Sequence, residues 1–304
     1  MRRAVSAAAA GACAAGAARL AYSAMNRRPP GGPKAWSRTN HRGEPVTLLE
    51  GPAVAAGAIA GALAQEVQAG LASASGSPGS PGWRPAAAMV MGGAGAAAFG
   101  AYDDLAGSGD RRGFRGHLGA LRHGEVTTGA VKLGGIGVTG IISAALAGGS
   151  PADVILNAGL VAGSANLLNL FDLRPGRAIK VTAVSGTLLG AAGQDGVAAP
   201  LGAALALLPE DLGERAMLGD AGANALGAML GVAAAGLSRP ARIALLAGIA
   251  GLTAASEKVS FTKVIARTPA LNWLDMLGRR PPSQPPAPQP SPVTILAQQP
   301  EPAG

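Results

Sequence analysis

Long stretches of small apolar residues alternate with short polar segments along the chain. A helix needs roughly 20 mostly apolar residues to cross a bilayer, so stretches near that length predict membrane spans. Nine such segments follow one another, at residues 4–24, 46–70, 85–102, 128–147, 152–170, 178–192, 197–208, 216–237 and 240–255. The polar break at 193–196 either separates two short helices or lies within one re-entrant element. The pattern predicts an all-α, polytopic membrane helix bundle with about nine transmembrane helices.

The composition agrees with a membrane location. Of the 304 residues, 48% are hydrophobic and only 14% are charged, and the mean hydropathy is +0.29. Aromatic residues make up only 3% of the chain, so a soluble core would lack its usual bulky side chains. Alanine and glycine suit closely packed membrane helices instead. We therefore expect a multi-pass protein of the cell (plasma) membrane.

Basic residues gather in alternate loops. The loops after the first, third, fifth and last segments carry Arg27, Arg28, Lys34, Arg38 and Arg42; Arg111, Arg112, Arg115 and Arg122; Arg174, Arg177 and Lys180; and Lys258, Lys263, Arg267, Arg279 and Arg280. Because Lys and Arg resist translocation, we predict that these loops are cytoplasmic, with the N-terminus outside and the C-terminus inside. Arg2 and Arg3 before an alanine-rich stretch also fit a signal peptide, but that insertion would place the basic loops outside.

Three regions divide the chain. We expect a polytopic membrane domain at 1–257, an amphipathic cytoplasmic helix at 258–277 with Trp273 at headgroup level, and a disordered Pro-rich tail at 278–304. The net charge of +8 is explained by the cytoplasmic loops. We expect no nucleic-acid partner, because no basic face with stacking aromatics accompanies that charge.

Carboxylates at the ends of the apolar segments are the first candidates for chemistry, because charge beside a bilayer is expensive. Asp103, Asp104, Asp172 and Asp220 all fall on the predicted cytoplasmic side. Asp220 could simply cap a helix N-terminus. Asp103 and Asp104 end a helix, where its dipole disfavours negative charge, so a cation or a basic partner would relieve them. Hard oxygen ligands select Mg²⁺, with Mn²⁺ as an alternative. The single cysteine and the absence of a Cys/His cluster argue against zinc.

A polar stripe precedes Asp172. Asn166, Asn169 and Asp172 recur at a spacing of three and so share one face of a helix, where they could bind a ligand or form interhelical hydrogen bonds. Lys132 and Arg42 could supply positive charge to phosphates, or could be snorkelling anchors at the membrane surface.

In order and spacing, these motifs resemble the polyprenyl-phosphate glycosyl-1-phosphate transferase family that includes MraY and WecA (glycosyltransferase family 4). The resemblance covers roughly residues 38 to 255 and rests on Asn40-His-Arg-Gly-Glu-Pro, the Asp103-Asp104 pair, Asn166-Leu-Leu-Asn-Leu-Phe-Asp172 and Leu218-Gly-Asp-Ala-Gly-Ala-Asn-Ala-Leu-Gly227. It implies transfer of a sugar-1-phosphate from a UDP-sugar to undecaprenyl phosphate with Mg²⁺, releasing UMP, in cell-envelope glycan assembly. It also allows a homodimer.

The resemblance implies roles for the site residues. Asp220 would ligate the metal on the pyrophosphate, and Asp103 or Asp104 would orient or deprotonate the lipid phosphate. Asp172 and Asn169 would hold the nucleotide sugar. Phosphoryl transfer needs positioning and neutralisation of developing charge, which these residue types supply.

The chain also departs from the family pattern. Where relatives carry a second aspartate after Asp172, this chain has Pro175, flanked by Arg174 and Arg177 as further candidates for substrate binding. The late cytoplasmic loop, Ser256–Lys263, contains no histidine, although relatives carry histidines there. These departures leave open a catalytically degenerate scaffold that binds a polyprenyl lipid or a nucleotide. A small-solute transporter would need ionisable residues near span centres, and almost none are present.

Overall fold

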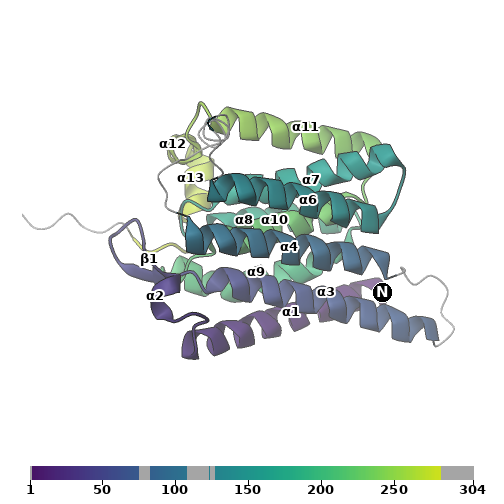
Figure 1. Ribbon diagram of the computed structural model, residues 1–304, viewed down its shortest axis with the longest axis horizontal. Coiled ribbons are helices and arrows are strands. Elements are labelled where there is room, and N and C mark those ends of the chain that lie inside the picture. The colour runs from purple at the N-terminus through teal and green to yellow at the C-terminus, as the bar shows by residue number, and fades with distance from the viewer. Residues whose placement is uncertain (1, 75–82, 108–122, 124–126, 282–304) are drawn as a thin grey trace, which may run out of the picture.

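The computed structural model describes residues 2–74, 83–107, 123 and 127–281. Within this part the fold is all-α: the long helices lie side by side with roughly aligned axes, and the start of the chain lies at the opposite end of the bundle from α2, β1, α12 and α13 (Figure 1). The helices are α1 Arg2–Arg27, α2 Pro33–Trp36, α3 Glu50–Ala74, α4 Arg84–Ala106, α6 Thr128–Ala147, α7 Pro151–Phe171, α8 Arg177–Ala191, α9 Ala198–Leu212, α10 Gly219–Ala234, α11 Arg239–Ser256, α12 Phe261–Arg267 and α13 Pro269–Met276.

Each apolar segment that we predicted contains a helix, although 46–47 belong to a strand and α10 is shorter than the segment 216–237. The break at 193–196 separates two helices, α8 and α9, joined by the 3-10 turn Asp195–Val197. The expected number of membrane spans is not reached. Among the described residues, three helices are long and apolar enough to cross a membrane, α1, α6 and α7, or up to four if α11 and α12 are taken as one bent span. A membrane location is therefore plausible from these helices, whereas nine full spans are not supported.

Helix length and polar residues explain why fewer helices than expected could cross a membrane. Helices α8 and α9 have 15 residues each and α10 has 16, which correspond to about 22 to 24 Å against a hydrocarbon core of about 30 Å. Helix α3 is long, but Gln65, Glu66 and Gln68 interrupt its apolar run.

The predicted amphipathic segment at 258–277 forms two helices, not one. Pro269 is the first residue of α13, and because proline disfavours helical backbone before it, α12 ends at Arg267. Helix α12 bends away from α11 by 96°. Trp273, Leu271 and Val264 are exposed. The part of the predicted tail beyond Pro281, and Arg111, Arg112, Arg115 and Arg122, lie outside the described residues.

A two-stranded hairpin precedes α3 and was not predicted. Strands β1 (Ser37–Thr39) and β2 (Pro45–Thr47) pair antiparallel, with Arg38 opposite Val46. Thr47 also joins the segment before α10, because its carbonyl accepts from the Met217 backbone N–H at 2.8 Å. The hairpin thereby ties the first loop to the start of α10.

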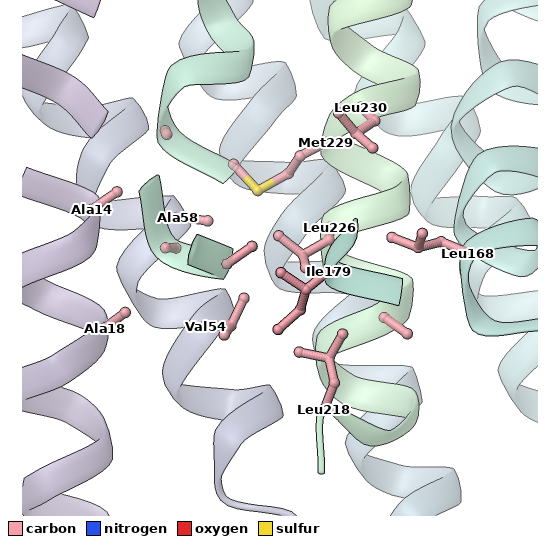
Figure 2. Close-up of a cluster of buried hydrophobic side chains, with 14 of the residues drawn as sticks. Ala14, Ala18, Val54, Ala58, Leu168, Ile179, Leu218, Leu226, Met229 and Leu230 are labelled. Carbon is pink, nitrogen blue, oxygen red and sulfur yellow. The ribbon is translucent and has the colours of Figure 1, made fainter. Parts of the chain in front are cut away.

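Small side chains fill the core between helices. Ala14 and Ala18 of α1 face Val54 and Ala58 of α3, and larger residues gather around α10, among them Leu226 (Figure 2). Helix α10 is buried along almost its whole length. It is therefore the central helix, and its N-terminus, which carries Asp220, is held by its neighbours.

Candidate functional site

Three helix ends bring three charged side chains to one point. Asp103 lies in the last turn of α4, Lys132 in the second turn of α6 and Asp220 at the start of α10. The Lys132 Nζ atom lies 2.6 Å from Asp220 Oδ2 and 3.0 Å from Asp103 Oδ2. The Asp103 and Asp220 carboxyl groups also contact each other. The ammonium group therefore sits where two carboxylates converge.

The Asp104 side chain makes different contacts from those of Asp103. Its two carboxylate oxygens accept hydrogen bonds from the backbone N–H groups of Asp220 (3.1 Å) and Ala221 (2.9 Å). These donors are in the first turn of α10, which has no partners for them within its own helix. Asp104 of α4 thus caps α10 from outside, as an N-cap residue would do from within. This contact fixes the ends of the two helices against each other.

Glycines allow the helices to approach so closely. A side chain at Gly100 of α4 would clash with the Asp220 carbonyl of α10. A side chain at Gly51 of α3 would lie 2.7 Å from the Gly222 backbone nitrogen. Because glycine has no Cβ, backbones can touch at these positions, as in membrane helix pairs with small residues at the interface. The glycines around the aspartates therefore set the geometry of the site.

Asp172 lies next to this cluster. It follows the last residue of α7 and accepts from the Gly219 backbone N–H, one residue before Asp220. Burial raises the pKa of Asp172 well above its ordinary value, and the negative charges of Asp211, Asp220 and Asp104 raise it further. Ionisation of this carboxyl group is therefore less favourable than it is in water.

Two further buried carboxylates, Glu50 and Asp211, were not predicted from the sequence. Glu50, the first residue of α3, is 0% exposed, and neither carboxylate oxygen has a hydrogen-bond partner among the described residues. Asp211 Oδ2 accepts from the Gly176 backbone N–H at 3.0 Å and so caps α8. Burial raises the pKa of Asp211 to about 7. Glu50 carried a usable signal, because it is a lone carboxylate in front of an apolar run.

Arg38 also joins the site and was not predicted to do so. Its guanidinium donates to the backbone carbonyl of Asp104 and to that of Ser37 at 2.8 Å. A cation at the C-terminal end of α4 interacts favourably with the helix dipole. The hairpin therefore reaches the aspartate pair through this arginine.

The other predicted arginines are held elsewhere. Arg42 Nε donates to both Glu214 carboxylate oxygens (2.9 and 3.0 Å), and its Nη2 donates to the carbonyls of Arg280 (3.1 Å) and Pro281 (2.8 Å). Arg177 is buried and pairs with Asp275. Arg174 is partly exposed, and its guanidinium contacts only the Leu173 carbonyl among the described residues, at 3.4 Å. The structure therefore does not bring Arg42 or Arg177 to the aspartate cluster.

Asn166 and Asn169 lie on α7 before Asp172, as the spacing predicted. Both side chains are half-buried, and neither forms a hydrogen bond to Asp103, Asp104 or Asp220.

Within the described ranges, no group of three or more His, Cys, Asp or Glu side chains is arranged to hold a metal ion. A cavity of about 260 Å³ beside the hairpin, lined by residues such as Asn26, Trp36 and Arg215, contains none of the predicted site residues.

The chain matches no protein-family model and no curated protein sequence.

Proposed function

We propose that the protein transfers a sugar-1-phosphate from a UDP-sugar to a polyprenyl phosphate at the cytoplasmic face of the cell membrane, releasing UMP. The observation that carries this proposal is the convergence of Asp103, Lys132 and Asp220, with Asp104, from three helices at one end of the bundle. A mixed cluster of carboxylates and an ammonium can position phosphates and neutralise the charge that develops during phosphoryl transfer.

The donor set fits Mg²⁺ in its chemistry. Asp103 and Asp220 present carboxylate oxygens to a common point, and Mg²⁺ in proteins is bound through one or two carboxylates together with substrate phosphates. These two residues would hold the ion, which when bound would neutralise charge on the pyrophosphate. Asp104 already accepts two backbone hydrogen bonds, so its part is to hold α10 in position.

The remaining residues of the chain supply positioning and proton chemistry. Asp172 follows the last residue of α7 beside the start of α10 and can hydrogen-bond to the nucleotide sugar. Asn166 and Asn169 lie on the same helix with half-buried amides and can extend that contact along α7. Arg174, next to Asp172, has no carboxylate partner among the described residues and can approach a phosphate.

The test is turnover by the purified full chain in detergent. Undecaprenyl phosphate, Mg²⁺ and a panel of UDP-sugars are supplied, and UMP release is compared with that of Asp220→Asn. We expect release by the wild type and a loss of at least about 100-fold in the variant. Absence of release above the variant across the whole panel would sink the proposal.

A second function is favoured by one feature of the sequence. Pro175 stands where the transferase pattern has an aspartate. A proline side chain can bind neither a metal ion nor a sugar hydroxyl. The second candidate is therefore a scaffold that binds a polyprenyl phosphate or a nucleotide without turnover. Saturable binding of UMP or undecaprenyl phosphate, with no product formed, would favour this alternative.

We propose that the helix bundle lies in the membrane, with the N-terminus outside and the end that carries Asp103, Asp104 and Asp220 facing the cytoplasm. In a Cys13→Ala background, Leu105→Cys should react with an impermeant maleimide only after permeabilisation. Ala192→Cys, at the turn between α8 and α9, should react in intact cells. The opposite pattern would contradict this orientation.

A further inference from the structure

Lys132 occupies the point at which the Asp103 and Asp220 carboxylates converge. The three side chains are mostly buried, at 12%, 17% and 26% exposure respectively. In such surroundings the attraction between an ammonium and two carboxylates is little screened by water. The lysine is thus the resident cation of this site.

The same two carboxylates are the ones that remain for a divalent ion. Asp104 is engaged with the backbone N–H groups of Asp220 and Ala221, and within the described chain no third His, Cys, Asp or Glu side chain completes a metal site with Asp103 and Asp220. A metal ion and the Lys132 ammonium would therefore compete for the same two carboxylates. Two positive charges cannot share that point, because they repel each other and each needs the oxygens as its partners.

The lysine ammonium can move farther than the two carboxylates, whose helix ends are fixed against each other. Asp103 lies one residue from Asp104, whose contacts with α10 fix the end of α4, and Asp220 lies in the buried α10. The Lys132 ammonium is carried on a flexible four-carbon stem with rotatable donors. Displacement of the ammonium therefore requires no rearrangement of the helices.

We propose that Lys132 is a place-holder cation, which holds Asp103 and Asp220 together in the empty site and is displaced by a divalent cation toward the phosphate groups of the substrate. This inference rests on the proposed function for the identity of the ligands. It makes Lys132 a positioning residue that weakens metal binding in the absence of phosphate, so that metal and phosphate favour each other's binding.

The first experiment measures Mn²⁺ binding to the purified full chain in detergent by electron paramagnetic resonance, with the metal alone. Lys132→Met should bind Mn²⁺ at least about tenfold more tightly than the wild type, because its competitor is gone. Lys258→Met removes the same charge from an exposed position and should leave the affinity unchanged. Addition of Asp220→Asn to Lys132→Met should abolish the tight binding, which assigns it to this site. Equal or weaker Mn²⁺ binding by Lys132→Met would overturn the proposal.

A second measurement uses the unaltered protein, in case Lys132→Met does not fold. Acylation of Lys132 by an N-hydroxysuccinimide ester is followed by mass spectrometry with and without Mn²⁺. Displacement should make Lys132 react several times faster when the metal is present, whereas Lys258 should not change. Unchanged or slower reaction of Lys132 would refute the place-holder role. Because neither readout needs turnover, tighter binding and faster acylation without UMP release would refute the transferase alone.

Discussion

Arg177 and Asp275 form a two-point ion pair across 98 residues of sequence, with Nε to Oδ1 at 2.7 Å and Nη2 to Oδ2 at 3.1 Å. Arg177 is 4% exposed and Asp275 is 8% exposed. Lys180 donates to the Asp275 carbonyl at 2.6 Å, and Arg279 pairs with the same carboxylate at 2.8 Å. This pair fastens α13 to the start of α8 and explains why Arg177 is withdrawn from the aspartate cluster.

Removal of one partner of the Arg177–Asp275 ion pair should therefore strongly destabilise the fold. Asp275→Ala leaves the Arg177 guanidinium buried without its carboxylate, which we expect to destabilise the fold by about 3–5 kcal/mol. The thermal unfolding midpoint of the protein in detergent measures this effect. The matched variant is Arg177→Met with Asp275→Leu, which removes both charges and should be much less destabilising. Equal losses in the single and the double variants would mean that packing, not the ion pair, holds α13.

The cap on α10 separates the roles of two adjacent aspartates. Asp104→Ala leaves the Asp220 and Ala221 N–H groups without acceptors and should lower stability by about 1–2 kcal/mol. Asp103→Ala, one residue away, does not touch those groups and should leave the unfolding midpoint closer to that of the wild type, while UMP release falls in both variants. If Asp103→Ala were the more destabilising change, Asp104 would not be the residue that holds α10.

Close contact between α4 and α10 makes Gly100 a sensitive position, although glycine itself carries no functional group. In Gly100→Ala, the new methyl group would overlap the Asp220 carbonyl and force α4 from α10. We expect about 1–3 kcal/mol of destabilisation and a loss of UMP release. Gly134→Ala in α6 meets nothing within 4 Å and should be neutral or slightly stabilising. A normal unfolding midpoint and normal release by Gly100→Ala would show that the helices can separate without harm to the site.

Much of this architecture follows from local sequence signals. The apolar runs predict helices at the right places because helix formation under a hydrophobic pattern needs only near neighbours, and the polar break at 193–196 marks the turn between α8 and α9. The four aspartates could be placed at one end because consecutive predicted segments were assumed to alternate in direction. The pairing of Arg42 with Glu214 could not be predicted in this way, since it depends on a contact between segments far apart in the sequence.

The hairpin of β1 and β2 shows a second limit of prediction from local sequence. Strands of three residues, such as β1 and β2, are too short for an alternating pattern to stand out. Their position is set by Arg38, which donates to the Asp104 carbonyl, and by the Met217 N–H, which donates to Thr47. Neither contact leaves a trace in the local sequence, so this region was predicted only as a basic cytoplasmic loop followed by an apolar segment at 46–70.

Asp211 gives the pH dependence that the structure predicts most directly. It is buried at the end of α9, beyond the apolar part of that helix, and burial raises the pKa of its carboxyl group from 3.8 to about 7. Because the folded pKa is the higher one, the stabilisation by the neutral form is fully present below about pH 4 and is lost as the pH rises through 7. Asp211→Asn keeps an oxygen for the Gly176 N–H but never becomes charged.

The unfolding midpoint of the wild type should therefore fall relative to that of Asp211→Asn between pH 5 and pH 8. Asp211→Ala removes the acceptor at every pH, so α8 loses its cap, and this variant should be less stable than Asp211→Asn throughout. Thermal unfolding of the three proteins at matched ionic strength measures both differences. A gap between wild type and Asp211→Asn that stays constant over this range would mean that the carboxyl group ionises without penalty in the folded protein, because Lys180 and Arg279, whose charges favour the ionised form, would then offset its burial.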